Sequence, residues 1–322
     1  MKIISLTSVI ILCFSGINRA NDNAKYPILV LTTGKNFGMF TGEILRTEGF
    51  NEFLMHSMEN ERITSDYLKK FDLIILTAAT LTKTQAEIFD RYVKDGGNLI
   101  AFQPDEKLSK VFGIIRRKGT IGEAYIQVDT NTRAGKGITS QTLQFHGKAD
   151  LSDLHGGKKI AALFKDAAEP TNYPALVANN YGKGHAYAFL YNLPQSIVYT
   201  RQGNYQYAGR EMDGIDGIRA MDMFTNGWVD TSKNTLNQAD EQMRLLSHCI
   251  EDMSSYTKPL PRFWYFPDSL KCLVTLTNDG EDSREDEFQP QFADVDSKGA
   301  KMTLYIKETD LVSEAWVSKW AG

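Results

Sequence analysis

The sequence predicts an α/β fold in which short buried strands alternate with helices. Residues 72–76 and 98–102 are short apolar runs, as expected for strands that are covered on both faces. Between them, apolar side chains recur at helical spacing from Ile88 to Val93, and a pair of glycines ends the pattern. Because strands and helices alternate, we expect an open parallel sheet with helices on both faces.

Three further elements complete the predicted start of this sheet. Residues 28–32 form a short apolar strand, residues 42–48 a helix that ends at a glycine, and residues 53–56 a second strand. At the start of the helix that ends before residue 96, Thr84 and Glu87 match the pattern of a capping box. In such a box, the hydroxyl and the carboxylate each accept a hydrogen bond from an unpaired amide at the helix start.

From residue 119 to residue 200, the pattern changes towards strands. We expect four short strands, with a hairpin turn between the last two at residues 181–184. The predicted strands are residues 124–128, 160–164, 175–179 and 186–191. The first domain is therefore a parallel sheet with β-rich additions.

The run FDLIILTAATLTKTQAEIFDRYVKDGGNLIAF, residues 71–102, resembles the class I glutamine amidotransferase-like fold. The resemblance implies a flavodoxin-like parallel-sheet domain over residues 25–255. In that family, the nucleophilic cysteine occupies the sharp turn after the strand that corresponds to residues 99–102. This chain has Gln103-Pro104-Asp105 there, without a cysteine or serine, so the resemblance implies the fold without the glutaminase activity.

Residues 192–236 are a long polar segment in which aromatic residues are interspersed. Aromatic rings beside amides and carboxylates suit sugars, which offer an apolar face and a fringe of hydroxyls. The alternative is an ordered surface loop whose aromatic side chains pack beneath it. Within the segment, Asp213-Gly214-Ile215-Asp216-Gly217 hints at calcium, but it lacks the bidentate glutamate and the oxygen spacing of a calcium loop.

The boundary between two domains is predicted in residues 256–270. Before it, residues 237–253 form an amphipathic helix. Within this boundary, residues 258–267, KPLPRFWYFP, combine three prolines with four aromatic residues and predict a stiff linker. A second strand–helix–strand–helix unit follows, with its later elements at residues 288–297, 302–306 and 313–320.

The second unit opens with an apolar strand that runs directly into acidic residues. Residues 272–277 predict a strand covered on both faces, and Asn278-Asp279-Gly280-Glu281-Asp282 follow without a spacer. Carboxylates that crowd one turn repel one another unless a cation or a substrate uses them. The alternative is an ordinary solvated acidic turn.

This unit resembles the start of the polysaccharide deacetylase family, which is built on a (β/α) barrel and opens with a strand ending in TFDDG. The resemblance places Asp279 at the metal-ligand position and Asn278 at the position of the catalytic base. An amide cannot accept the proton, and the nearby Glu281 or Asp282 could substitute, although the family pattern does not require either. The family holds a divalent metal, commonly zinc, with one aspartate and two histidines. Two strands cannot close a barrel, so we expect residues 271–322 to be the first two β/α units of an incomplete barrel.

The N-terminus predicts export to the periplasm or the exterior. Residues 1–20 combine a positive start, an apolar core and a small residue for cleavage, and the apolar run is too short to span a bilayer. A net charge of −4 without a basic stretch argues against nucleic acid as a partner. We expect the two cysteines after the signal, Cys249 and Cys272, to be buried free thiols.

Two functional hypotheses follow from the sequence. The first is an exported, metal-dependent polysaccharide deacetylase-like hydrolase that removes acetyl groups from a glycan, preceded by a non-catalytic amidotransferase-like domain. The second is a non-catalytic glycan-binding or scaffold protein that uses the amidotransferase-like domain. Both predict a polysaccharide or another glycan as the partner.

Overall fold

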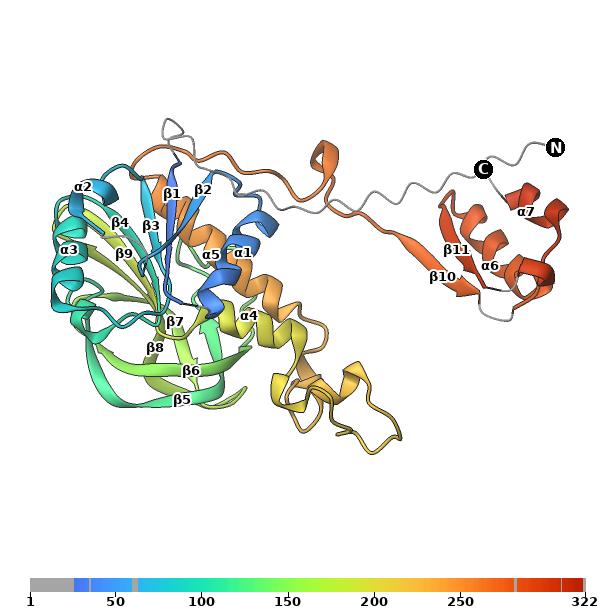
Figure 1. Cartoon of the computed structure of the whole chain (residues 1–322), viewed down its shortest axis with the longest axis horizontal. Helices are drawn as coiled ribbons and strands as arrows, with labels where there is room; N and C mark the ends of the chain where they lie inside the picture. The colour runs from blue at the N-terminus through green and yellow to red at the C-terminus, as the bar shows by residue number, and fades with distance from the viewer. Residues whose placement is uncertain (1–25, 35, 60–62, 281–282, 308, 321–322) are drawn as a thin grey trace. The chain divides into compact units, whose positions relative to one another are not determined.

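The computed structural model describes residues 26–34, 36–59, 63–280, 283–307 and 309–320 of the chain (Figure 1). The chain divides after Phe263 into two compact units. The predicted signal peptide, the two carboxylates Glu281 and Asp282, and the last two residues lie outside the described residues. Every described helix is too short or too polar to cross a lipid bilayer.

The first unit is built on a nine-stranded mixed sheet with the order β2-β1-β3-β4-β9-β8-β7-β5-β6. The first five strands in this order are parallel: β2 (Phe53–Ser57), β1 (Ile28–Thr32), β3 (Leu73–Leu76), β4 (Asn98–Phe102) and β9 (Gly184–Phe189). The others continue the sheet in antiparallel fashion: β8 (Pro170–Tyr181), β7 (Lys158–Phe164), β5 (Ile114–Val128) and β6 (Leu143–Leu154). The predicted α/β class with β-rich additions is confirmed, and β6 is a strand that the sequence pattern did not predict.

Helices cover both faces of the parallel part (Figure 1). Alternate residues of β1 point to opposite faces, so Ile28 and Val30 pack in one core cluster while Leu29 and Leu31 pack in the other. The first cluster includes residues of α1 (Thr41–Thr47), α4 (Leu193–Gln202) and α5 (Gln238–Ser254). The second includes residues of α2 (Ser65–Leu68) and α3 (Lys83–Lys94).

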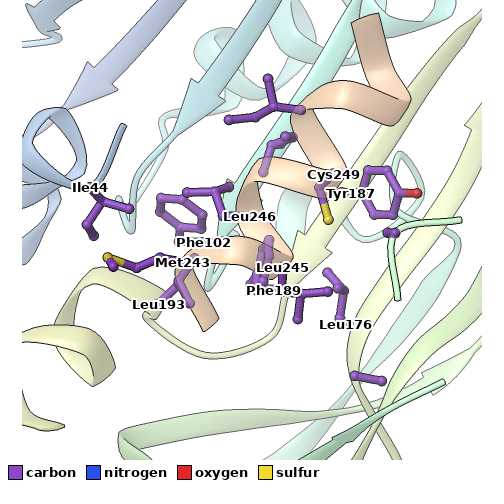
Figure 2. Close-up of a cluster of buried hydrophobic side chains, with 14 of the residues drawn as sticks. Ile44, Phe102, Leu176, Tyr187, Phe189, Leu193, Met243, Leu245, Leu246 and Cys249 are labelled. Carbon is purple, nitrogen blue, oxygen red and sulfur yellow. The ribbon is translucent and has the colours of Figure 1, made fainter. Parts of the chain in front are cut away.

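Helix α5 fills the centre of the first cluster. Figure 2 shows Met243 and Leu246 facing Phe102 of β4, and Cys249 beside Tyr187 of β9. Cys249 is fully buried and free, as predicted, so it packs as a small apolar side chain. Cys272 is also a free thiol, as predicted, but its predicted burial is wrong, because Cys272 is exposed.

The capping box of α3 lies two residues earlier than predicted. Thr82 accepts a hydrogen bond from the amide of Gln85 at 3.2 Å, and Gln85 Oε1 accepts one from the amide of Thr82 at 2.9 Å. Thr82 has the extended backbone of a cap, whereas Thr84 already lies inside the helix. The proposed box of Thr84 and Glu87 is therefore wrong by two residues.

The polar segment after β9 is more regular than its composition suggested. It begins with α4, where Asn192 accepts a hydrogen bond from the amide of Gln195 and Pro194 occupies the first turn. Three short 3-10 turns follow: η3 (Tyr205–Tyr207), η4 (Ala220–Phe224) and η5 (Thr231–Lys233). The predicted helix and linker after this segment correspond to α5 and the chain around Phe263.

The second unit contains two parallel strands, β10 (Leu276–Gly280) and β11 (Met302–Ile306), and two helices, α6 (Glu285–Ser297) and α7 (Glu314–Trp320). Burial alternates along both strands, because the helices cover one face of this sheet. The predicted strand over residues 272–277, buried on both faces, is therefore wrong. Leu273 and Val274 are exposed, and the strand begins only at Leu276.

Candidate functional site

A pocket of about 670 Å³ opens at the carboxyl edge of the parallel strands of the first unit. In open α/β sheets, ligands bind outside the carboxyl ends of the strands. Thr33 follows β1, Thr80 follows β3 and Gln103 follows β4, and all three line the pocket. The charged lining residues are Asp105, Glu106, Lys107, Arg116 and Asp150. We call this cavity the carboxyl-edge pocket.

Gln103 occupies a sharp turn immediately after β4. Its φ of 42° lies in the left-handed region, which costs a non-glycine residue roughly 1–2 kcal/mol. The turn is held by hydrogen bonds that the Gln103 amide donates to the Phe189 carbonyl at 2.7 Å and that Nε2 donates to the Lys148 carbonyl at 3.3 Å. A sharp turn thus follows β4, and the side chain at this turn is an amide.

Asp105 ties this turn to the loop after β3. Its carboxylate accepts hydrogen bonds from the amides of Leu81 and Lys107, each at 2.9 Å. Burial pushes the pKa of Asp105 upwards, but the hydrogen bonds from the amides of Lys107 and Leu81, together with the ammonium group of Lys107, lower the pKa overall. Asp105 is therefore an ionised carboxylate that shapes the pocket wall.

The β-rich addition brings an ion pair into the pocket. Arg116 Nη2 lies 2.5 Å from Asp150 Oδ2, and Arg116 Nη1 donates to the Pro104 carbonyl at 3.5 Å. Asp150 is only 5% exposed, and this burial raises its pKa, while the charge of Arg116 opposes the shift. Arg116 is partly accessible, so its remaining N–H groups can reach a ligand while Asp150 fixes its position.

The site residues predicted in the second unit lie on opposite faces of β10. Asn278 is half-buried and donates from Nδ2 to Gln291 Oε1 of α6 at 3.1 Å, whereas Asp279 is exposed. Both residues are part of the strand and do not follow it as a turn. The structure therefore does not bring Asn278 and Asp279 together, and Asp282 lies outside the described residues.

One acidic cluster in the described part of the chain has the spacing of a cation site. Carboxylate oxygens of Glu211, Asp213 and Asp222 lie within 4.8 Å of one another. The buried Asp222 carboxylate accepts hydrogen bonds from the amides of Arg219, Met212 and Asp213, and these bonds lower its pKa. Its oxygens are thus engaged by backbone, so the cluster organises a turn and points to no particular metal.

The comparisons with known proteins identify no family. No family model matches the chain, and no curated protein matches it. Three similar solved structures are a β-galactosidase from Bacillus circulans sp. alkalophilus (14% identity, TM-score 0.42), an exo-β-1,4-mannosidase from Opitutaceae bacterium strain TAV5 (11%, 0.41) and the carbohydrate deacetylase Agd3 (16%, 0.40). They match 54%, 56% and 52% of this chain, which spans 30%, 33% and 29% of theirs. These likenesses are partial and assign no activity to the chain.

Proposed function

We propose that this chain is a carbohydrate-active protein whose first unit binds a sugar in the carboxyl-edge pocket without catalysing a reaction there. The observation that carries the proposal is Gln103, which occupies the sharp turn after β4 with a side chain that can hydrogen-bond but cannot act as a nucleophile. The order β2-β1-β3-β4 of the parallel strands, which is that of flavodoxin-like sheets, supports the assignment to the amidotransferase-like class.

The chemistry of the pocket suits a polyol. Each sugar hydroxyl can donate one hydrogen bond and accept others, so a sugar site needs both donors and acceptors. Gln103, Lys107 and Arg116 supply donors, while Asp105 and Asp150 supply acceptors. Two cations face three carboxylates in the pocket, a balance that favours a neutral ligand over an acidic one. Predicted export over residues 1–20 agrees with a glycan ligand.

A binding experiment tests this proposal. Calorimetric titration of the chain with neutral monosaccharides, including N-acetylglucosamine, should give saturable binding that Arg116→Lys weakens about tenfold, because lysine cannot form the same planar contacts. Arg117→Lys is the matched control, since Arg117 lies on the same strand as Arg116 but is exposed and pairs with Asp153 of β6. Equal affinities for the two variants, or ammonia release from glutamine above a buffer blank, would contradict a non-catalytic sugar pocket.

The second candidate function is the metal-dependent removal of acetyl groups by a deacetylase-type unit. The observation that favours it is Asp279, which lies next to the carboxyl end of β10 on the face that the helices leave uncovered. Barrel enzymes gather catalytic groups at this end of their strands. Zinc bound there would polarise an acetyl carbonyl and activate water. Asp279 would be a ligand, Asn278 would not share its face, and Asp282 remains the proposed base.

Zinc titration separates this candidate from a solvated acidic strand. One aspartate holds a transition ion weakly, so we expect the chain to bind zinc weakly. The Asp279→Ala variant should lose this binding, and the Asp296→Ala variant should keep it. Asp296 is a suitable control because it is an exposed carboxylate on α6. Equal zinc affinities for the wild type and Asp279→Ala would remove the metal proposal and leave the sugar-binding proposal intact.

A further inference from the structure

A second residue with left-handed backbone lies at a β-bulge between β5 and β6, the strands that carry Arg116 and Asp150 of the carboxyl-edge pocket. Glu123 has a φ of 47°, and the register of the two strands shifts between Gly122 and Ala124. Its carboxylate is anchored by the ring nitrogen Nδ1 of His146 at 2.6 Å and by the amide of Gly147 at 2.9 Å. The side chain nevertheless remains 50% exposed. Backbone strain that surrounding contacts maintain is typical of binding and catalytic sites.

His146, which contacts the Glu123 carboxylate, is itself buried and held in place. The imidazole is 2% exposed and stacks on Trp228, with ring centres 4.2 Å apart and planes at 3°. Gly147 has a φ of 93°, and a Cβ there would lie 2.8 Å from Gln195 Oε1. The glycine therefore lets the side-chain amide of Gln195, on α4, lie close to the backbone that donates a hydrogen bond to Glu123.

Tyr199 lies next to Gln195, and Tyr205 stacks on Tyr199. The pKa of Tyr199 is raised by burial and, to a smaller extent, by Tyr205 and Glu123, while a hydrogen bond with Gln195 lowers it. The rings of Tyr199 and Tyr205 stack with centres 5.9 Å apart and planes at 17°. Tyr205 is 61% exposed, so it presents an aromatic surface to solvent beside Tyr199, whose ring also contacts Trp228, the residue that stacks on His146.

The position of Tyr205 is fixed by its neighbours in the chain. Asn204 is 8% exposed, donates its amide to the Met223 carbonyl at 2.7 Å and accepts the Gln206 amide at 3.1 Å. Gly203 has a φ of 80°, and a Cβ there would lie 2.7 Å from Met223. The exposed ring thus belongs to a 3-10 turn whose backbone is held in place, so a ligand that stacks on the ring loses little conformational entropy in ordering it.

We propose that Glu123, Gln195 and Tyr205 form a second carbohydrate subsite, so that the ligand is an oligosaccharide and not a single sugar. A pyranose ring stacks its C–H face on Tyr205, and its hydroxyls donate to Glu123 and accept from Gln195. This inference rests on the proposed sugar pocket. Strand β6 carries His146 beside the subsite and Asp150 in the pocket, four residues or roughly 13 Å apart along an extended strand. A short sugar chain spans that distance, whereas one ring does not.

The test uses calorimetric titration of the whole chain with N-acetylglucosamine and with its β-linked hexamer. We expect tighter binding of the hexamer, and a loss of about tenfold in hexamer affinity for Tyr205→Ala with unchanged monomer affinity. Tyr205→Phe keeps the ring and should retain the hexamer affinity, whereas Glu123→Gln should lower it severalfold. Tyr256→Ala is the control, because Tyr256 is also exposed but stacks on His185.

The outcomes separate this inference from the sugar pocket itself. The second subsite alone is overturned if the monomer binds and Arg116→Lys weakens that binding, but the hexamer binds no more tightly than the monomer. The same conclusion follows if the Tyr205→Ala variant binds the hexamer like the wild type. Absence of binding by both sugars overturns the sugar pocket and the subsite together. Both substitutions of Tyr205 are at an exposed position, and unchanged thermal melting would show that the fold is kept.

Discussion

The two units place polar residues at the ends of parallel strands in different surroundings. In the first unit, β1, β3 and β4 are buried on both faces, and the residues after them line a pocket in which Lys107 pairs with Asp105 and Arg116 pairs with Asp150. In the second unit, β10 is covered on one face, and Asp279 is exposed on the other. An acidic motif at a strand end is therefore not itself a site, because neighbouring elements must enclose it and fix its charges.

The largest difference between the units should appear in their cores. Phe189→Ala removes a fully buried ring that packs edge-on against Phe102, and we expect it to lower the free energy of unfolding of the first unit by about 4 kcal/mol. Tyr305→Ala, at an exposed position of β11, should change stability by less than about 0.5 kcal/mol. Urea unfolding followed by circular dichroism measures both, and similar losses would show that the second sheet is enclosed on both faces.

The next largest effect should come from the ion pair of the pocket. Arg116→Met leaves the buried Asp150 charge without its partner, which should cost about 3 kcal/mol at pH 7. Because burial raises the pKa of Asp150 above its ordinary value, the folded state favours the protonated carboxyl, and ionisation costs stability as pH rises through the folded pKa. The loss should therefore be smaller at pH 4. Arg117→Met is the control, and a loss that does not depend on pH would argue against the pair.

Relieving the backbone strain at the sharp turn after β4 should have a smaller effect of opposite sign, because it should raise the free energy of unfolding. Gln103→Gly should be about 1 kcal/mol more stable than Gln103→Ala, because only glycine adopts a φ of 42° without a steric penalty. Both variants lose the same hydrogen bond to the Lys148 carbonyl, so their difference isolates the backbone term. Equal melting temperatures in a thermal scan would show that the turn is unstrained.

The smallest effect should belong to the exposed aspartate of β10. Asp279→Ala removes a solvated carboxylate and should change the free energy of unfolding by less than about 0.5 kcal/mol. Asp150→Ala removes a buried partner of Arg116 and should cost several times more. A large loss for Asp279→Ala, measured by the same urea titration, would mean that Asp279 has a structural partner outside the described residues.

Much of the fold could be predicted because apolar runs report burial. The continuous runs at residues 28–32 and 98–102 identified β1 and β4 with their observed bounds, and helical spacing identified α3 and α5. Strand β6 was missed because its sequence, LQFHGKADLSDL, mixes polar residues with a bulge and breaks the alternation of a strand. Residues 272–277 have strand composition but lack the second covering layer that would bury them.

The pocket could be predicted only in part. Gln103 was singled out because the family resemblance places a nucleophile there, and its position after β4 follows from the strand pattern. Arg116 and Asp150 carry no local signal, since their roles depend on the antiparallel pairing of β5 with β6, which brings together residues 34 positions apart in the chain. Tyr199 and Tyr205 belonged to a segment predicted for sugar contact, but α4 and the turn that fixes Tyr205 appear only in the structure.

Hydrogen exchange measured by mass spectrometry, with and without a saturating N-acetylglucosamine oligomer, compares the two units in one experiment. If the first unit binds the sugar, amides in residues 101–107 and 114–123 should exchange more slowly in the presence of the oligomer, because they border the carboxyl-edge pocket and the bulge at Glu123. Amides in residues 276–280 should exchange at the same rate with and without it. Slower exchange confined to residues 276–280 would contradict a sugar site in the first unit and would move ligand binding to Asp279.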